Sequence, residues 1–260
     1  MFKTINFANR NLKEIFLDPL MYIFCLAFPL LMLILFDVIN VYASGNTPMF
    51  ELKSLLPSII MFSYTFVMLT MALLVSKDKQ TFFLKRLYSS PMKTYDYILG
   101  YAIVGFLIGL LQTLCCILSA FLISIVKTVE FISLLDCIIL VVTQLPVLIT
   151  FIFLGILFGT VFNDKSAPGI CSILISLAGM LGGCWMPIET MGGFETFCRF
   201  LPFYPSVYLG RIVTGASNIF NEPYTFDSVA KLGLIPIATT LIASVVLSIV
   251  VFNKNMVSDK

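Results

Sequence analysis

The stretch CIILVVTQLPVLITFIFLGILFGTVF, residues 137–162, contains no Asp, Glu, Lys, Arg or His. A helix that spans a bilayer needs about 20 consecutive, mainly apolar residues, and this stretch is long enough. Its Gly, Thr and Gln residues are of the kinds that membrane helices use where they pack on one another. We therefore predict that residues 137–162 form a membrane-spanning helix.

Five more stretches are comparably apolar. Together with residues 137–162 they give six predicted spans, at about residues 20–41, 55–75, 98–126, 137–162, 168–186 and 232–252. We therefore predict a single all-α, polytopic membrane domain over residues 1–260. We expect the first stretch to be retained, because residues 1–19 are long and contain Glu14 and Asp18, unlike the short basic leader of a signal peptide.

The composition excludes most soluble functions. Hydrophobic residues make up 59% of the 260 positions and charged residues 12%, against about 25% charged in a typical globular domain. A net charge of +2 is too small for a nucleic-acid-binding surface. Because the chain has no His, Ser-His and Cys-His catalysis are excluded. We expect no catalytic residues, no metal site and no nucleic-acid partner.

The basic residues predict the orientation. If both termini lie on one side, eleven of the sixteen Lys and Arg residues fall on that side. Loops rich in Lys and Arg stay in the cytoplasm. We therefore predict a multi-pass protein of the cell membrane with both termini in the cytoplasm.

The apolar cores of the six stretches, the first taken as residues 20–36, contain no charged side chain. Ion-coupled carriers usually keep such a group at membrane depth, so this absence weakens ion-coupled transport. The neutral polar residues inside are expected to make interhelical hydrogen bonds, with substrate contact as the alternative. They include Thr143, Gln112, Gln144 and Thr150. Three Gly-xxx-Gly pairs, at 105/109, 155/159 and 179/183, would permit close helix packing.

Two predicted cytoplasmic segments combine basic and apolar residues. Residues 2–17 form an amphipathic pattern that ends at Asp18-Pro19, and Phe7 is misplaced on its polar face. They are expected to lie in the membrane interface, or to serve only as a basic anchor. The loop at residues 76–97 contains five cationic residues and a predicted short helix at 81–88. Its aromatic residues favour a docking surface for a partner over simple attraction to lipid headgroups.

The longest predicted outer loop follows the fifth span. Residues 187–204 are apolar but too interrupted to cross the membrane, and a re-entrant pair of half-helices is predicted there. Cys184 and Cys198 both fall near the outer face, although nothing else indicates an exterior built on disulfides. The chain has no Gly-x-x-x-x-Gly-Lys-[Ser/Thr] loop, so any ATPase that drives it must be another polypeptide.

Three motifs, in this order, carry a resemblance to a known family. They are FLKRLYSSPM at 83–92, LGILFG at 154–159, and GGCWMP at 182–187 followed by FLP at 200–202. With six spans and an N-terminal interfacial helix, the chain resembles the permease subunit of an ABC-2-type transporter, of the drug- and antibiotic-export kind. The resemblance covers essentially the whole chain.

The resemblance implies partners and sites. It implies two permease subunits, identical or homologous, in the bilayer, and a pair of cytoplasmic ATPase subunits that bind the ATP, with no cofactor in this chain. It assigns ATPase docking to the N-terminal helix and the first cytoplasmic loop, at Arg10, Asp18, Phe83, Lys85, Arg86, Leu87 and Pro91. It assigns an external gate to Gly182, Gly183, Pro187, Glu189 and Pro202.

The resemblance also bears on the cargo. The uncharged interior, rich in Phe and Met, suits a hydrophobic or amphipathic compound such as an antibiotic, peptide or lipid-like molecule. Some members of the family export polysaccharide or teichoic-acid-type polymers, typically with a more aromatic and basic N-terminal segment than this one. A stand-alone secondary transporter or membrane scaffold is the alternative from a different class.

Overall fold

The computed structural model describes residues 2–19, 22–42, 47–81 and 94–258. These residues form helices and connecting turns, and no β-strand occurs among them. The long helices are α3 (Phe28–Tyr42), which continues a π-helical segment η1 (Tyr22–Ala27), α4 (Leu52–Gln80), α6 (Thr94–Lys127), α7 (Leu134–Val161) and α11 (Ser228–Ser258). The shorter elements are α1 (Phe2–Leu17), η2 (Pro48–Phe50), α8 (Ala167–Leu181), η3 (Ile188–Thr190), α9 (Gly193–Arg199) and α10 (Phe203–Thr214).

Five of these segments are long and apolar enough to cross a membrane, namely Cys25–Tyr42, Leu52–Gln80, Thr94–Lys127, Leu134–Val161 and Ser228–Asn255. They confirm the predicted all-α polytopic fold. The fifth predicted span, 168–186, corresponds to α8, which has 15 residues and a length of about 22 Å. The predicted stretch is longer than this helix because the chain turns at Gly182 and Gly183, where Gly183 adopts a left-handed φ of +66°.

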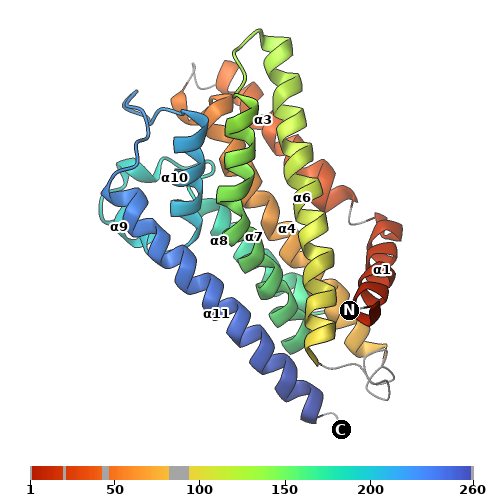
Figure 1. Cartoon of the computed structure of the whole chain (residues 1–260). Helices are drawn as coiled ribbons and strands as arrows, with labels where there is room; N and C mark the ends of the chain where they lie inside the picture. Colours follow the sequence, from red (N-terminus) through yellow and green to blue (C-terminus); the bar gives the residue numbers. More distant parts are fainter. Residues whose placement is uncertain (1, 20–21, 43–46, 82–93, 259–260) are drawn as a thin grey trace.

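Both termini lie at one end of the helix bundle, together with the last turn of α4 and the first turn of α6 (Figure 1). We call this the proximal end, and the opposite end, where α3 ends and α4 begins, the distal end. The helix α1 ends at Leu17, where Asp18-Pro19 was predicted to stop it, and packs against α6.

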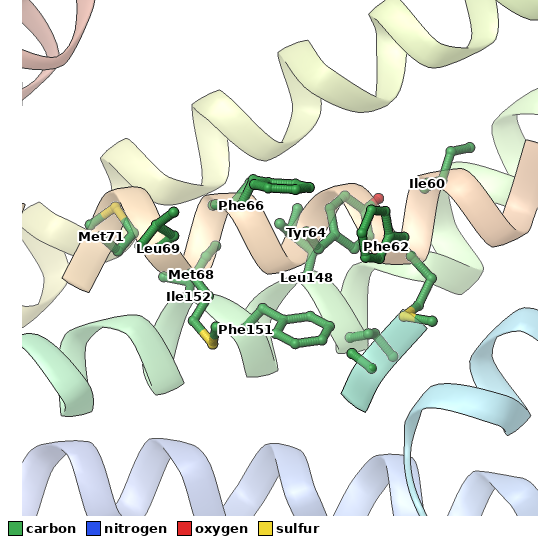
Figure 2. Close-up of a cluster of buried hydrophobic side chains, with 14 of the residues drawn as sticks. Ile60, Phe62, Tyr64, Phe66, Met68, Leu69, Met71, Leu148, Phe151 and Ile152 are labelled. Carbon is green, nitrogen blue, oxygen red and sulfur yellow. The ribbon is translucent and has the colours of Figure 1, made fainter. Parts of the chain in front are cut away.

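The helix α4 is the centre of the bundle. Its apolar window is 89% buried, against 22–44% for the other candidate spans, because α3, α6, α7, α8 and α10 surround it. Figure 2 shows side chains of α4, among them Tyr64 and Met68, beside Leu148, Phe151 and Ile152 of α7 in one buried cluster. The outward faces of the other long helices are apolar and exposed, as expected for contact with lipid.

The glycines of α7 permit the closest helix contact. A Cβ at Gly155 would lie 2.5 Å from the backbone oxygen of Met68, and one at Gly159 would lie 2.6 Å from that of Ala72. These oxygens belong to α4, so the two helix backbones touch without intervening side chains. The close packing predicted from the pair at 155/159 is confirmed.

The predicted faces of the N-terminal helix are wrong in part. Phe7 is buried, with ring contacts to Tyr97 and Tyr101 of α6 at 5.5 and 5.0 Å, whereas Ile5 is 43% exposed. The ring of Phe7 fits because α6 has Gly100 there, where a Cβ would lie 2.5 Å from Phe7 Cδ1. The helix therefore packs on protein through a face that amphipathicity alone does not identify.

Three charged side chains that lie outside the uncharged apolar cores are nevertheless inside the bundle. Asp37 in α3, Asp78 in α4 and Arg211 in α10 are all buried. The helices extend beyond the apolar stretches, and each of these charges meets a partner of opposite sign. Lys127 of α6, for example, donates to Asp37 at 2.6 Å and ties α3 to α6 at the distal end.

Candidate functional site

Polar side chains gather at the two ends of α4. We call the first group the proximal cluster; it comprises Arg10, Glu14, Lys77, Asp78, Lys79, Tyr101, Thr160 and Asn255. Its centre is the last turn of α4, where three consecutive residues, Lys77, Asp78 and Lys79, each bind a different part of the bundle. The turn lies directly before residues 82–93.

Asp78 is 1% exposed and accepts three hydrogen bonds. Nη1 of Arg10 lies 2.8 Å from each of its carboxylate oxygens, and the Tyr101 hydroxyl donates to Oδ2 at 2.7 Å. A buried carboxylate needs such donors, because removal from water strongly disfavours its charge. Arg10 also pairs with Glu14 at 2.7 Å. Asp78 thus joins α1, α4 and α6.

The two lysines beside Asp78 reach other helices. Lys77 pairs with Glu14 of α1 at 2.8 Å. Lys79 donates to the backbone oxygen of Thr160, near the end of α7, at 2.8 Å, and Asn255 of α11 donates to the same oxygen at 3.1 Å. One turn of α4 is therefore connected to α1, α6 and α7, and through Thr160 to α11.

Of the predicted docking residues, Arg10 is in this cluster. Asp18 follows α1 and is exposed, and its backbone N–H donates to the Ile15 oxygen at 3.0 Å. Phe83, Lys85, Arg86, Leu87 and Pro91, with most of the predicted helix at 81–88, lie outside the described residues. The docking role of all seven stays a prediction.

The distal cluster surrounds Arg211, which is 3% exposed. It comprises Arg211, Ser54, Ser58, Gly183, Glu189 and Tyr224. Nη2 of Arg211 donates to the Ser58 hydroxyl at 3.1 Å and to the Gly183 oxygen at 2.9 Å, and Nε donates to the Ser54 oxygen at 3.5 Å. The planar fork of an arginine suits several acceptors in fixed directions. The guanidinium thereby joins α10 to α4 and to the turn after α8.

Two further side chains contact Arg211, and one of them, Glu189, balances its charge. Nη1 donates to the Tyr224 hydroxyl at 3.1 Å and lies 3.9 Å from Glu189 Oε1. The Tyr224 hydroxyl in turn donates to Glu189 Oε1. Burial raises the pKa of Tyr224, and although Arg211 opposes this shift, Glu189 adds to it. The phenol therefore stays protonated and serves as the hydrogen-bond donor that Glu189 requires.

The predicted gate residues lie around this cluster. The backbone oxygen of Gly183 and the carboxylate of Glu189 contact Arg211. Gly182 packs so closely on Met61 of α4 that a Cβ at this glycine would overlap Met61 Cε. Pro187 precedes η3, and Pro202 is buried at the start of α10. The structure brings Gly183 and Glu189 to Arg211, whereas Pro202 lies at the opposite end of α10, and the role of all five residues as a gate stays a prediction.

The helices after Pro187 differ in their burial. The seven-residue helix α9 is largely exposed, whereas nearly every residue of α10 up to Arg211 is buried. The stretch predicted as half-helices, 187–204, contains η3 and α9 but only the first two residues of α10. Sequence reasoning therefore missed Arg211. The signal for it was one cation in the otherwise uncharged segment 200–221.

The neutral polar residues of the spans mostly bind their own helices. Gln144 of α7 binds another helix: its amide donates to the Ser206 oxygen of α10 at 2.9 Å and accepts from the Ser206 hydroxyl at 2.8 Å. Thr143 and Thr150 donate to backbone oxygens of α7. Gln112 is buried, and its amide has no partner among the described residues. The interhelical hydrogen bond predicted for Gln144 is confirmed.

Cys184 and Cys198 are both free and buried. The Cys184 thiol donates to the Ser58 oxygen of α4 at 3.3 Å, which is a further contact between the turn after α8 and α4. The structure therefore contains no disulfide between these two positions.

The comparisons agree with this architecture of apolar spanning helices. The model of a family described as "ABC-2 family transporter protein" matches residues 39–253, which include all five candidate spans in whole or in part, as well as α8 and the distal cluster. No curated protein matches the chain. Because the match covers most of its length, the chain belongs to the ABC-2 family of transporter proteins and is the membrane subunit of an ABC transporter.

Proposed function

We propose that this chain is the permease subunit of an ATP-driven exporter that moves a hydrophobic or amphipathic compound out of the cell. The proximal end faces the cytoplasm, in accord with the distribution of Lys and Arg. Two permease subunits form the pathway, and a separate ATPase pair docks at the proximal end. The proposal rests on family membership and on the connection between the two clusters.

That connection is α4 itself. Its 29 residues form a helix about 43 Å long, which contains Ser54 and Ser58 of the distal cluster near its start and Asp78 of the proximal cluster near its end. The helix is buried along most of this length, so it moves as a rigid body or not at all. A displacement of its last turn is therefore passed to the turn at Gly183, which Arg211 ties to Ser58.

The proposed cycle begins at α1. When the ATPase pair closes on ATP, it pushes on α1 and on the loop after Gln80. Arg10 and Asp78 transmit this push to α4, and α4 shifts the contacts of Arg211 at the distal end. ATP binding thus favours one of two arrangements of the permease, since a ligand shifts an equilibrium only by its differential affinity.

The cargo class rests on the lining that the helices offer. The bundle interior is apolar and rich in Met and Phe, with the buried charges confined to the two ends. Such a surface adapts to varied apolar shapes, because Met is flexible and polarizable. A charged polymer would leave its charges without partners over the length of the spans.

The test is reconstitution. The permease is co-expressed with candidate ABC ATPases from the same genome, captured by a tag, and placed in proteoliposomes with a panel of amphipathic antibiotics. We expect the ATPase to co-purify and at least one compound to stimulate ATP hydrolysis and ATP-dependent movement. The proposal would be refuted if no ATPase co-purified with the permease, or if the rate of ATP hydrolysis were the same with and without the permease. Replacement of the catalytic glutamate of the ATPase provides the matched negative control.

A further inference from the structure

A groove of about 500 Å³ opens on the membrane-facing side of the bundle near the proximal end. It is lined by the first turns of α6, by α7 and by the C-terminal third of α11, at Thr94, Tyr95, Ile98, Leu99, Phe153, Val245, Ile249 and Asn253. Figure 1 shows α11 running obliquely past α7 towards the first turn of α6, and both α6 and α7 contact α11. Pockets for drug-sized molecules have volumes of about 300–1,000 Å³.

The groove is open to the surrounding membrane rather than enclosed. Leu99 is 49% exposed and Ile249 39% exposed, whereas Ile98 at the base is buried. The α6 residues that line it fall within two turns of the proximal end of that helix, a depth of about 8 Å. Half of the hydrocarbon core is about 15 Å thick. With the proximal end in the cytoplasm, the groove therefore faces the inner leaflet.

Polarity changes along the groove. The deeper wall is aliphatic and aromatic, through Leu99, Phe153 and Ile249. The edge nearest the proximal end has a hydroxyl at Thr94 and a carboxamide at Asn253, and neither makes a hydrogen bond to another described residue. These groups are thus available to a ligand. Such a ligand would need a polar head at the proximal edge and an apolar body against the deeper wall.

The groove also selects against charge. No charged side chain is among the described residues that line it. A phosphate is usually held by Arg or Lys, or by a helix N-terminus. The groove does reach the N-terminus of α6, but Asp96 in that first turn accepts a hydrogen bond from Thr4 at 2.9 Å and already provides the negative charge that this terminus favours, so a second anion would be repelled. A neutral head that donates and accepts hydrogen bonds fits this edge better than the phosphate of a phospholipid.

We propose that the groove between α6, α7 and α11 is a binding site for an uncharged amphiphile. The apolar chain of the ligand lies against Leu99, Phe153 and Ile249, and its hydroxyl- or amide-bearing head binds Thr94 and Asn253. On the proposed function, which this inference deepens, the site collects cargo from the inner leaflet before transport.

The experiment measures binding to the permease alone, without any ATPase. The protein is placed in phosphatidylcholine nanodiscs with a monoacylglycerol whose chain bears a diazirine, or with a phosphatidylglycerol that bears the same chain. After illumination, labelled peptides are mapped. We expect the monoacylglycerol to label peptides that contain residues 94–99 and 245–253 several-fold more than the phosphatidylglycerol does.

Two substitutions on α6 provide a matched pair. Leu99→Trp fills the groove, whereas Leu107→Trp adds the same ring two turns away at a site that is also about half exposed. Labelling should fall at least fivefold in the first variant and stay unchanged in the second. Thr94→Val with Asn253→Leu should weaken monoacylglycerol binding about tenfold and leave phosphatidylglycerol unaffected.

Equal labelling by the two probes, or labelling that Leu99→Trp leaves intact, would overturn the site and identify the groove as ordinary lipid contact. These readouts need no transport. A selective groove in a permease that engages no ATPase would leave the site standing and refute the proposed function. An active transporter whose groove shows no selectivity would refute the site and leave the proposed function standing.

Discussion

Nη1 of Arg10 lies 2.8 Å from both carboxylate oxygens of Asp78, although 68 residues separate them in the sequence. The contact fixes α1 to the last turn of the most buried helix of the bundle. A peripheral helix held in this way cannot move without α4. The pair therefore ties the N-terminal helix directly to the core of the bundle.

Asp78→Asn should uncouple the ATPase from transport. The substitution keeps the shape of the side chain and a hydrogen bond from Tyr101, but it removes the charge that Arg10 meets. Loss of a hydrogen bond between charged groups costs about 1.5–3 kcal/mol, so a folded but less stable protein is expected. Thermal unfolding and cargo-stimulated ATP hydrolysis measure the two effects.

The control for Asp78→Asn is Glu195→Gln. It disrupts the exposed pair with Arg199 on α9, at 2.7 Å, and exposed pairs of this type are worth about 0.3–0.5 kcal/mol. Equal losses of coupling in the two variants would contradict a specific role for Asp78.

Arg211→Lys should not reproduce the contacts that Arg211 makes in the distal cluster. A lysine keeps the charge, but its three N–H donors all leave one nitrogen, whereas Arg211 reaches Tyr224 from Nη1 and both Ser58 and Gly183 from Nη2, so we do not expect a lysine to make all three bonds. Removing one partner of a buried ion pair costs about 3–5 kcal/mol, and we expect Arg211→Ala near that range, with Arg211→Lys in between. Unfolding in detergent, followed by fluorescence of the single Trp185, measures this order. Wild-type stability in Arg211→Lys would show that charge alone suffices.

Gly155→Ala should destabilise the protein, whereas Gly169→Ala should raise its stability slightly or leave it unchanged. Alanine favours a helix by up to about 1 kcal/mol over glycine. At Gly169 no heavy atom lies within 4 Å of the new methyl group, so a small gain or no change is expected. At Gly155 the methyl group would meet the backbone of α4 at 2.5 Å, and overpacking of this kind costs about 1–3 kcal/mol. Thermal stability of the two variants in one detergent decides the matter.

The orientation predicts which cysteines are accessible. In a variant without native cysteines, Glu222→Cys should react with a membrane-impermeant maleimide in intact cells, because it lies at the distal end. Lys165→Cys, between α7 and α8, should react only after the cells are opened. Both positions are exposed, so protection reflects the membrane rather than burial. The reverse pattern would invert the topology.

The sequence predicts the spans well, because length and apolarity are enough to identify a membrane helix. It could not place the end of α8, since this depends on how Gly183 turns above Arg211. Nor could it identify the buried face of α1. Burial of Phe7 requires the space above Gly100 in α6, and that pairing is set by tertiary contact rather than by periodicity.

Arg211 shows the same limit at the candidate site. In the sequence it is one cation of a predicted outer loop. Its burial depends on Ser54 and Ser58, more than 150 residues earlier, whose acceptors α4 presents to it. Glu189 and Gly183 were predicted from the resemblance to the family, but the residue that joins them was not. Long-range charge pairing is not encoded in any local motif.

The central claim is that α4 transmits ATP binding from the proximal to the distal cluster. Trp185 offers a direct reporter, because it is the only tryptophan, stacks on Phe36 of α3 at 5.6 Å and meets Phe62 of α4 edge to face at 4.5 Å. The decisive measurement is the ¹⁹F NMR spectrum of the complex with 5-fluorotryptophan incorporated only in the permease. We predict that ATP shifts this resonance in the wild type and not in Asp78→Asn. A resonance that ATP leaves unmoved in the wild type, or moves equally in both proteins, would contradict the claim.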